Sequence, residues 1–284
     1  MRMHLDCIPC FQRQALQAVR FVTEDENQQQ QILRKVMMAL YKLDWRKTPP
    51  EIARVVHKIV KEETKQQDPY SQVKKENNDV ALKLYPSMKN LVNKSKDPLL
   101  TAIRIAIAGN IIDFGAKESF NITETIEKVL VTPFKINTYS KFVEILSNSQ
   151  VLTYLGDNAG EIVFDKLLLE TILEQFEIKN IQFAVKGGPI INDATIEDAE
   201  YVKLTSVPNI KFIKIEIGLP GIGLARRDEK FLEIIKKSDV VVSKGQGNYE
   251  ALSDQEKIFF LLLAKCPVLA RDLGVDVGDI VFKG

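Results

Sequence analysis

Short apolar runs alternate with helical segments throughout the second half of this chain, and this alternation restricts the possible folds more than any other feature. The runs rich in β-branched residues, which we predict to be strands, are residues 151–155, 181–185, 211–215, 240–242 and 267–270. Segments with helical spacing lie between most of them, at residues 161–176, 228–237 and 255–264. Because the runs are apolar rather than alternating with polar residues, both faces of the sheet should be covered. The pattern predicts a Rossmann-like α/β/α sandwich with a mainly parallel sheet.

The first half of the chain carries the signals of helices instead. Residues 23–26 form a capping box, and residues 48–51 form a second helix start with proline at the first helical position. Apolar residues at helical spacing follow both starts, and two further helical segments come before residue 113. We therefore expect a mainly helical N-terminal region over residues 1–147. It should pack on an α/β/α domain over residues 148–284 that carries the metal and phosphate site.

Composition excludes several classes of function. The chain has 284 residues, with 39 Lys and Arg against 38 Asp and Glu, so it lacks the basic excess expected of a nucleic-acid or membrane-surface partner. The apolar stretch at residues 259–264 is far shorter than the roughly 18 residues that span a bilayer. Three cysteines cannot form a disulfide framework, so we expect a cytoplasmic protein.

Polar and glycine-rich loops follow the predicted strands. In a parallel sheet, ligands bind outside the carboxyl ends of the strands, because the loops and the helix N-termini face one crevice there. The loops that reach this edge are residues 156–161, 186–195, 218–223 and 243–250. All four contain glycine, and three also contain carboxylate, amide or lysine side chains. A single such loop would be an ordinary turn, whereas several at one edge indicate a site.

The side chains in these loops suit phosphoryl transfer to water. Asp157, Asn158 and Asp193 are hard oxygen ligands, which suits a divalent ion such as Mg²⁺ or Mn²⁺, with Co²⁺ and Ni²⁺ as further candidates. Lys244 offers a positive charge at a glycine-rich strand-to-helix turn, where the backbone can approach an anion. Glu161 is our candidate general base. Asp193 could serve equally, or a carboxylate could act as nucleophile.

Asn110 and Asp113 are a second polar pair, on an otherwise apolar helix. Their spacing places them on one face, and both groups need partners when buried. Either they contribute to the crevice, or they form a capping network at the helix end near Gly115. The sequence favours neither interpretation.

Two other motifs carry less weight. The glycines at 218, 221 and 223 do not have the spacing of a dinucleotide fingerprint, so we exclude NAD binding there. Cys7 and Cys10 form a single C-x-x-C with His4 nearby. They are either a structural thiol pair, a redox pair or part of a metal site.

The loop motifs together resemble one known family. The stretches Gly-Asp-Asn-Ala-Gly-Glu at 156–161, Asn-Asp-Ala-Thr at 192–195 and Ser-Lys-Gly-Gln-Gly-Asn-Tyr-Glu at 243–250 resemble the metal-dependent damage-control phosphatases, formerly a domain-of-unknown-function family. Residues 109–113 and 264–268 also look like its pattern. Cys7 and Cys10 resemble its mainly archaeal branch with an N-terminal C-x-x-C.

The resemblance implies roles for individual residues. Asp157, Asn158 and Asp193 match the metal ligands of the family, and Glu161 matches the acidic position behind the first pair. Residues 244–248 match the loop around the substrate phosphate, and Lys265 matches a second lysine that contacts it. Together with the polar pair above, the expected substrate-binding residues are Asn110, Asp113, Gly245, Gly247, Asn248, Glu250 and Lys265. Leu219 departs from the family, since many relatives have a polar or acidic residue in that loop.

The sequence thus predicts a divalent-metal-dependent phosphatase acting on small phosphorylated metabolites, such as sugar phosphates or damaged phosphometabolites. Two alternatives remain at this point. One is an S-adenosylmethionine-dependent carboxyl methyltransferase, an activity also proposed within the family that the chain resembles. The other is a non-enzymatic metal- or thiol-binding module that uses Cys7 and Cys10. The sequence makes no prediction of the oligomeric state.

Overall fold

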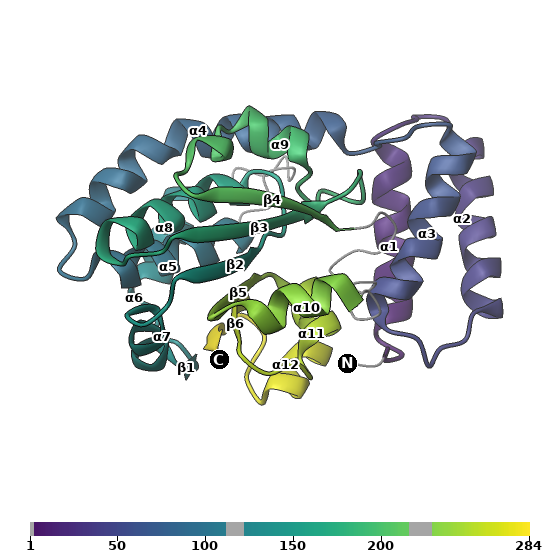
Figure 1. Cartoon of the computed structure of the whole chain (residues 1–284). Helices are drawn as coiled ribbons and strands as arrows, with labels where there is room; N and C mark the ends of the chain where they lie inside the picture. The colour runs from purple at the N-terminus through teal and green to yellow at the C-terminus, as the bar shows by residue number, and fades with distance from the viewer. Residues whose placement is uncertain (1–2, 112–121, 216–228) are drawn as a thin grey trace.

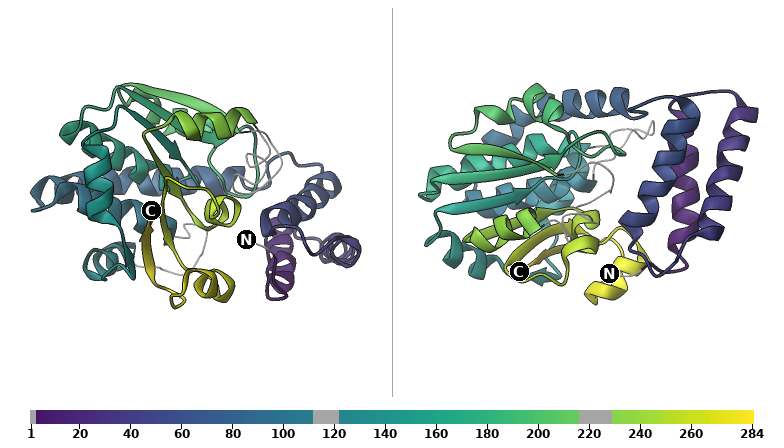
Figure 2. Two further views of the ribbon diagram at one scale, coloured as in Figure 1. Left: turned by 60° about the horizontal axis from the view of Figure 1, so that its bottom comes forward. Right: turned by 45° about the vertical axis from the view of Figure 1, so that its right-hand side comes forward.

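The computed structural model describes residues 3–111, 122–215 and 229–284. Asp113 and the loop at residues 218–223 therefore lie outside the described residues. Helices α1 (Cys7–Arg20), α2 (Glu26–Lys42) and α3 (Pro49–Thr64) form a bundle at one end of the molecule (Figures 1 and 2). Among the described helices, none is long and apolar enough to cross a membrane.

Local capping explains where the bundle helices begin. Thr48 and Glu51 form a capping box, with Pro49 at the first turn of α3, so the helix start predicted at residues 48–51 is confirmed. The helix start predicted with Thr23 as the cap lies two residues further along the chain. There Asp25, not Thr23, caps α2, and its side chain accepts from the Asn27 N–H at 2.9 Å.

In the described part of the chain, seven strands form one sheet in the order β1-β7-β6-β5-β2-β3-β4. Every neighbouring pair is parallel except β6 and β7, which are antiparallel. The strands are β1 (Ile136–Asn137), β2 (Val151–Leu155), β3 (Asn180–Lys186), β4 (Ile210–Ile215), β5 (Val240–Lys244), β6 (Ile258–Leu263) and β7 (Ile280–Lys283). The predicted mainly parallel α/β architecture is confirmed.

Separate apolar cores cover the two faces of the sheet, as the apolar strands require. One face packs against α4 (Ser71–Lys94), α5 (Pro98–Ile111), α6 (Ile122–Val131), α7 (Tyr139–Leu146), α8 (Glu161–Gln175) and α9 (Ile196–Tyr201). The other face packs against α10 (Glu229–Lys237), α11 (Gln246–Leu252) and α12 (Pro267–Leu273). Successive residues of a strand therefore enter different cores, as Val241 and Val242 of β5 do.

Two predictions near the C-terminus are wrong: a predicted helix is a strand, and a predicted strand is a helix. Residues 255–264 were expected to be helical but contain strand β6, and residues 267–270 were expected to be a strand but lie in helix α12. A six-residue apolar run without a polar face fits a buried strand as well as a buried helix. Here Pro267 occupies the first helical position, and Cys266 caps the helix by accepting from the Leu269 N–H at 3.4 Å.

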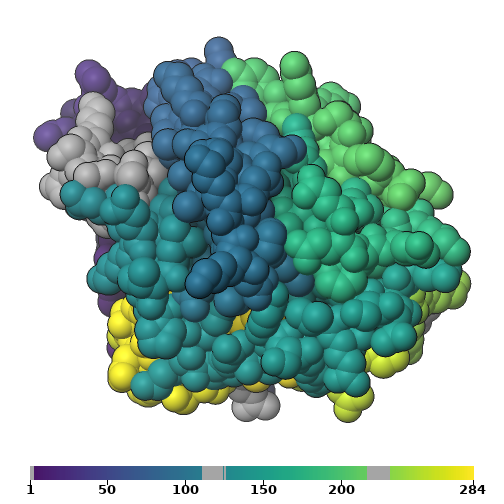
Figure 3. Space-filling view, turned by 90° about the vertical axis from the view of Figure 1, so that its left-hand side faces the viewer, coloured from purple at the N-terminus to yellow at the C-terminus, as the bar shows by residue number. Residues whose placement is uncertain are grey.

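The apolar packing divides the chain after Tyr70, earlier than the expected boundary at residue 147. The core of the bundle uses residues between Phe11 and Tyr70. The apolar residues of α4 and α5 instead belong to the large core on the sheet. Figure 3 shows α4 lying across the face of the α/β part, in contact with the segments that follow it. Helix α4 thus reaches from the sheet toward the bundle, next to the strand ends.

Candidate active site

A cavity of about 620 Å³ lies between the bundle and the carboxyl ends of the strands. The strands β6, β5, β2 and β3 lie side by side and are all parallel, so their carboxyl ends share one edge of the sheet, and the cavity forms at that edge. The predicted site residues that line it are Asn110, Asp157, Asn158, Asp193, Gly247, Glu250 and Lys265. Glu161, Lys244, Gly245 and Asn248 are not part of its lining and lie behind it.

The loops after β2 and β3 are joined by backbone hydrogen bonds. The Ala194 N–H donates to the Asp157 carbonyl at 2.8 Å, and the Ala159 N–H donates to the Asn192 carbonyl at 2.9 Å. Asn158 and Asp193 face each other in an isolated antiparallel bridge. This pairing places the predicted metal ligands of the two loops next to one another.

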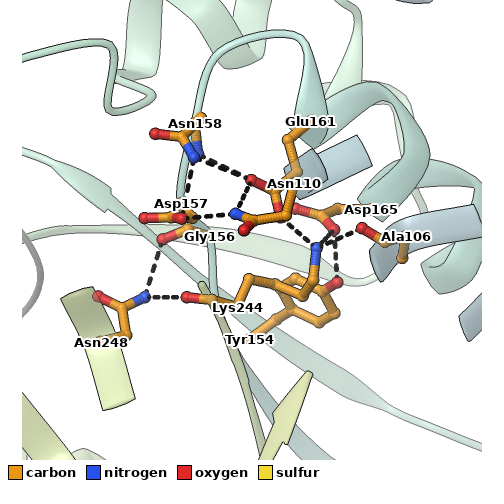
Figure 4. Close-up of polar contacts among 10 residues, drawn as sticks. All are labelled: Ala106, Asn110, Tyr154, Gly156, Asp157, Asn158, Glu161, Asp165, Lys244 and Asn248. Atoms are coloured by element: carbon orange, nitrogen blue, oxygen red, sulfur yellow. Dashed lines mark hydrogen bonds and ion pairs between the residues drawn. The ribbon is translucent and has the colours of Figure 1, made fainter. Parts of the chain in front are cut away.

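Amide donors hold one oxygen of the Asp157 carboxylate. Its Oδ2 accepts from Asn110 Nδ2 at 2.8 Å and from Asn158 Nδ2 at 2.9 Å. Figure 4 shows the other oxygen of Asp157 and the amide oxygen of Asn158 pointing to the same side, away from Glu161. The first loop therefore presents two oxygen atoms together on that side.

Gly245 makes the close approach to Asp157 possible. It has φ +80°, in the region that favours glycine, and a Cβ added here would lie 1.8 Å from Asp157 Oδ2. Asn248 joins the same two loops from behind: its Nδ2 donates to the Gly156 carbonyl at 3.2 Å and to the Lys244 carbonyl at 2.8 Å. Both residues thus shape the site without lining the cavity.

Lys244 lies in a different place from the one expected. Its fully buried ammonium donates to Asp165 Oδ1 and to the Ala106 carbonyl, each at 2.8 Å, and pairs with Glu161 (Figure 4). Burial alone lowers the pKa of Lys244, but Asp165 and Glu161 outweigh it and raise the pKa above its ordinary value. Lys244 is thus a buried counter-ion of two carboxylates, and its ammonium does not line the cavity.

Glu161 is equally enclosed. Besides Lys244, its carboxylate accepts from Asn110 Nδ2 at 2.8 Å and from Asn158 Nδ2 at 3.1 Å, and its side chain is fully buried. These bonds orient the two amides that hold Asp157. Glu161 therefore positions these amides from beneath the site. Its carboxylate does not line the cavity and is not placed to contact a water molecule there.

Negative charge is concentrated where the cavity meets the sheet. Burial raises the pKa of Asp157 well above its usual range, and the neighbouring Glu161 and Asp193 raise it further, whereas Lys265 and Lys186 oppose the shift. Lys186 Nζ lies 3.5 Å from Asp193 Oδ2. Carboxylates that lie close together favour a bound cation, because a cation relieves their repulsion.

The donor set of the two loops fits a hard divalent cation. It consists of the carboxylates of Asp157 and Asp193 and the amide oxygen of Asn158, all of which are oxygen ligands. Within the described ranges, no group of three or more His, Cys, Asp or Glu side chains is arranged to hold a metal ion. A cation at this edge would therefore depend on the amide as well as on the two carboxylates.

Asp165 was not identified from the sequence, and Lys186 was placed in the loop at 186–195 without a role, although both had a recognisable signal. Asp165 follows Glu161 by four residues, so the two share a face of α8. Lys186 is the last residue of β3, and like the predicted residues it stands at the carboxyl end of its strand.

The three cysteines line the same cavity, although Cys7 and Cys10 are far from Cys266 in sequence. All three are free thiols, and burial raises the pKa of Cys7 and Cys10 above the ordinary thiol value. Glu250 lies on this wall too. Burial raises its pKa to about 7, although Gln246, which donates to it at 2.7 Å, opposes the shift. The C-x-x-C is therefore part of the cavity wall.

Comparisons with known proteins agree over nearly the whole chain. The family model of the damage-control phosphatase ARMT1-like domain matches residues 3–281. A damage-control phosphatase of Archaeoglobus fulgidus is 34% identical over 284 residues, which are 98% of this chain and 97% of that protein. The crystal structure of a DUF89 family protein from Pyrococcus horikoshii has a TM-score of 0.90 and 31% identity, covering 99% of this chain and 98% of that chain.

Part of this chain is also similar to part of another enzyme. The 4′-phosphopantetheine phosphatase of Mus musculus is 28% identical over 151 residues, which are 46% of this chain and 18% of that protein. Membership of the branch with an N-terminal C-x-x-C stays a prediction that rests on Cys7 and Cys10. The full-length matches are sufficient for the family itself: this chain belongs to the family of damage-control phosphatase ARMT1-like domains.

Proposed function

We propose that this protein is a divalent-metal-dependent phosphomonoester hydrolase that acts on small phosphorylated metabolites. One observation carries the proposal: the carboxylates of Asp157 and Asp193, the amide of Asn158 and the cation of Lys265 line one cavity at the carboxyl edge of the sheet. Two archaeal relatives that match along nearly their full length are named damage-control phosphatases, which supports the same reaction class.

Asp157, Asn158 and Asp193 would hold the divalent ion, for which Mg²⁺, Mn²⁺, Co²⁺ and Ni²⁺ are the candidates. When bound, such an ion polarises a phosphoryl oxygen and lowers the pKa of a water molecule. The two amides and Gly245 hold Asp157 in one orientation, so its carboxylate is preorganised for the ion.

Other residues of the cavity would act on the phosphoryl group directly. Lys265 is exposed to the cavity and would offset the negative charge of the phosphoryl oxygens. The backbone N–H of Gly247, at the start of α11, would assist it. We assign proton acceptance from the attacking water to Asp193 rather than to Glu161, because Asp193 lines the cavity and Glu161 is enclosed by Lys244 and two amides.

The cavity has the size of a small-molecule site, which typically measures ~300–1,000 Å³. Its phosphate-binding end would be the strand edge, and the remainder of the substrate would lie against the bundle, where Phe11, Pro50 and Tyr70 form part of the wall. Sugar phosphates and damaged phosphometabolites fit this size. Phosphopantetheine belongs in the same set of candidates, because a partly matching relative is named for it.

Phosphate release from a panel of substrates tests the proposal. The protein is stripped of metal, and Mg²⁺, Mn²⁺, Co²⁺ or Ni²⁺ is added back with sugar phosphates, nucleotides, phosphopantetheine or a chromogenic ester. We expect turnover only with added metal. Asp157→Asn and Asp193→Asn should each lower it by on the order of 100-fold or more, because each removes an anionic ligand with little change of shape.

Asp276→Asn is the matched control, since Asp276 is exposed and is not part of the cavity lining. It should leave turnover unchanged. Equal turnover with and without metal, or full activity in either site variant, would contradict the assignment. Methyl transfer from S-adenosylmethionine by folded protein that releases no phosphate would favour the methyltransferase alternative.

A further inference from the structure

Asn78 lies behind both ligand-bearing loops, although it comes from α4 and lies outside all the motifs noted in the sequence. It is 1% exposed. Its neighbour Asn77 lines the cavity, whereas Asn78 is directed into the protein interior toward the loop after β2 and toward α9.

The carbonyl end of the Asn78 side chain holds the first loop. Its Oδ1 accepts from the Gly160 N–H at 2.6 Å. Gly160 has φ +81° and immediately precedes α8, which begins at Glu161. This bond therefore fixes the turn that follows Asp157 and Asn158.

The amino end of the same side chain holds the second loop. Asn78 Nδ2 donates to Asp198 Oδ1 at 3.1 Å. The other oxygen of Asp198 accepts from the N–H and the hydroxyl of Thr195, each at 2.9 Å, and lies 2.6 Å from Lys74 Nζ. Thr195 comes two residues after Asp193, so Asp198 fixes the end of the loop that carries this ligand.

The orientation of the Asn78 amide is determined by its partners. One end faces an N–H donor and the other faces a carboxylate, and an amide with its oxygen toward Gly160 and its amino group toward Asp198 satisfies both. An aspartate would keep the bond to Gly160 but place a second carboxylate against Asp198. A leucine would lose both bonds and leave buried polar groups without partners.

We propose that Asn78 is a positioning residue that sets the separation between the Asp157–Asn158 pair and Asp193, and thereby the affinity of the site for its divalent ion. The inference rests on the proposed function, since it assumes that these three residues bind metal. Groups that orient metal ligands from behind typically contribute about 10- to 100-fold in affinity.

A side-chain exchange tests this assignment. Asn78→Asp removes the hydrogen bond between the two positions. Asp198→Asn removes it too, because its amide oxygen faces the donors of Thr195 and Lys74 and its amino group then faces the amino group of Asn78. The double variant restores it in the opposite sense, because the new amide at position 198 donates to the new carboxylate at position 78. The restored pair keeps acceptors for Gly160 and Thr195 and leaves the net charge of the protein unchanged.

The measured quantity is the Kd for Mn²⁺ of metal-stripped protein, by isothermal titration calorimetry without substrate. We expect each single variant to bind Mn²⁺ about tenfold or more weakly and the double variant to return to within about threefold of the wild type. Asn93→Asp, at an exposed position of the same helix, is the control and should bind as the wild type does.

Wild-type affinity in Asn78→Asp, or a double variant no tighter than the single variants, would overturn the inference. If Asn78→Asp fails to fold, the comparison of Asp198→Asn with the double variant decides by the same criterion. A different result would show that the proposed function itself is wrong. A wild-type protein that releases phosphate but binds no divalent ion would overturn the metal assignment, and this inference with it.

Discussion

Lys244 Nζ lies 2.8 Å from Asp165 Oδ1, and both side chains are fully buried beneath the cavity. Asp165 also accepts from the Tyr154 hydroxyl at 2.7 Å. The lysine compensates a pair of buried carboxylates, one of which, Glu161, orients the amides on Asp157. The charge of Lys244, which was expected from the sequence to lie beside the substrate phosphate, thus supports the site from inside the protein.

Removal of this lysine should destabilise the fold. Lys244→Met leaves Glu161 and Asp165 buried without their cation, which typically costs about 3–5 kcal/mol. The double variant with Asp165→Leu should lose less, because one buried carboxylate is removed as well. Urea unfolding of both variants measures these changes. Lys179→Met, at an exposed position, is the control, and an equal loss in control and Lys244→Met would contradict the assignment.

Gly245→Ala should impair the proposed metal site through a steric conflict with Asp157. The added Cβ would lie 1.8 Å from Asp157 Oδ2, so the carboxylate has to move. Gly274→Ala is a matched control, since Gly274 has φ +70° and no atom within 4 Å of an added Cβ. Backbone strain should cost Gly274→Ala about 1–2 kcal/mol of stability and Gly245→Ala more, because the ψ of 165° puts Gly245 outside the left-handed helical region. Only Gly245→Ala should weaken Mn²⁺ binding, by about tenfold or more, and equal Kd values in the two variants would oppose the prediction.

Lys265→Met should lower kcat/KM for phosphomonoesters by about ten- to a hundredfold, the usual effect of losing a hydrogen bond to a charged group. The Kd for Mn²⁺ should not weaken, because Lys265 is a cation and not a ligand. Steady-state kinetics and calorimetry measure the two effects. Lys265→Arg should retain part of the activity, and Lys257→Met, at an exposed position, should retain all of it. Unchanged kinetics in Lys265→Met would remove this lysine from the phosphate site.

His57 should make the protein sensitive to acid. Burial, with the neighbouring Lys61, lowers the pKa of His57 to about 4 from an ordinary value of 6.5. Between these values the unfolded chain binds a proton that the folded protein does not, so the free energy of unfolding falls as the pH falls. From pH 7 to pH 4.5 the loss should reach about 2–3 kcal/mol.

Urea unfolding at several pH values checks this contribution. His57→Leu removes the titrating group, so its unfolding free energy should depend less on pH in this window. His4→Leu replaces the other histidine of the chain, which is exposed, and should keep the wild-type dependence. Parallel pH curves for His57→Leu and the wild type would disprove the contribution of His57.

The sequence by itself determined the class of fold and the edge at which the site lies. Apolar runs joined by helices require a sheet covered on both faces, and the carboxyl ends of its parallel strands share one edge. Asp157, Asn158 and Asp193 could therefore be brought together before any coordinates were known, because all three lie in loops that leave the carboxyl ends of strands. The same rule did not resolve residues 255–270, where an apolar run without a polar face fits a strand or a helix.

Only the tertiary structure decided which way the charged side chains point. Lys244 is the last residue of β5, and successive strand residues face opposite sides of the sheet, so its ammonium enters the side covered by α5 and α8. Lys265 lies beyond the end of β6 and remains at the cavity. Both faces of these strands are apolar, so the sequence contains no signal for the face on which a lysine lies. That depends on Glu161 and Asp165, two carboxylates that helix α8 brings there from another part of the chain.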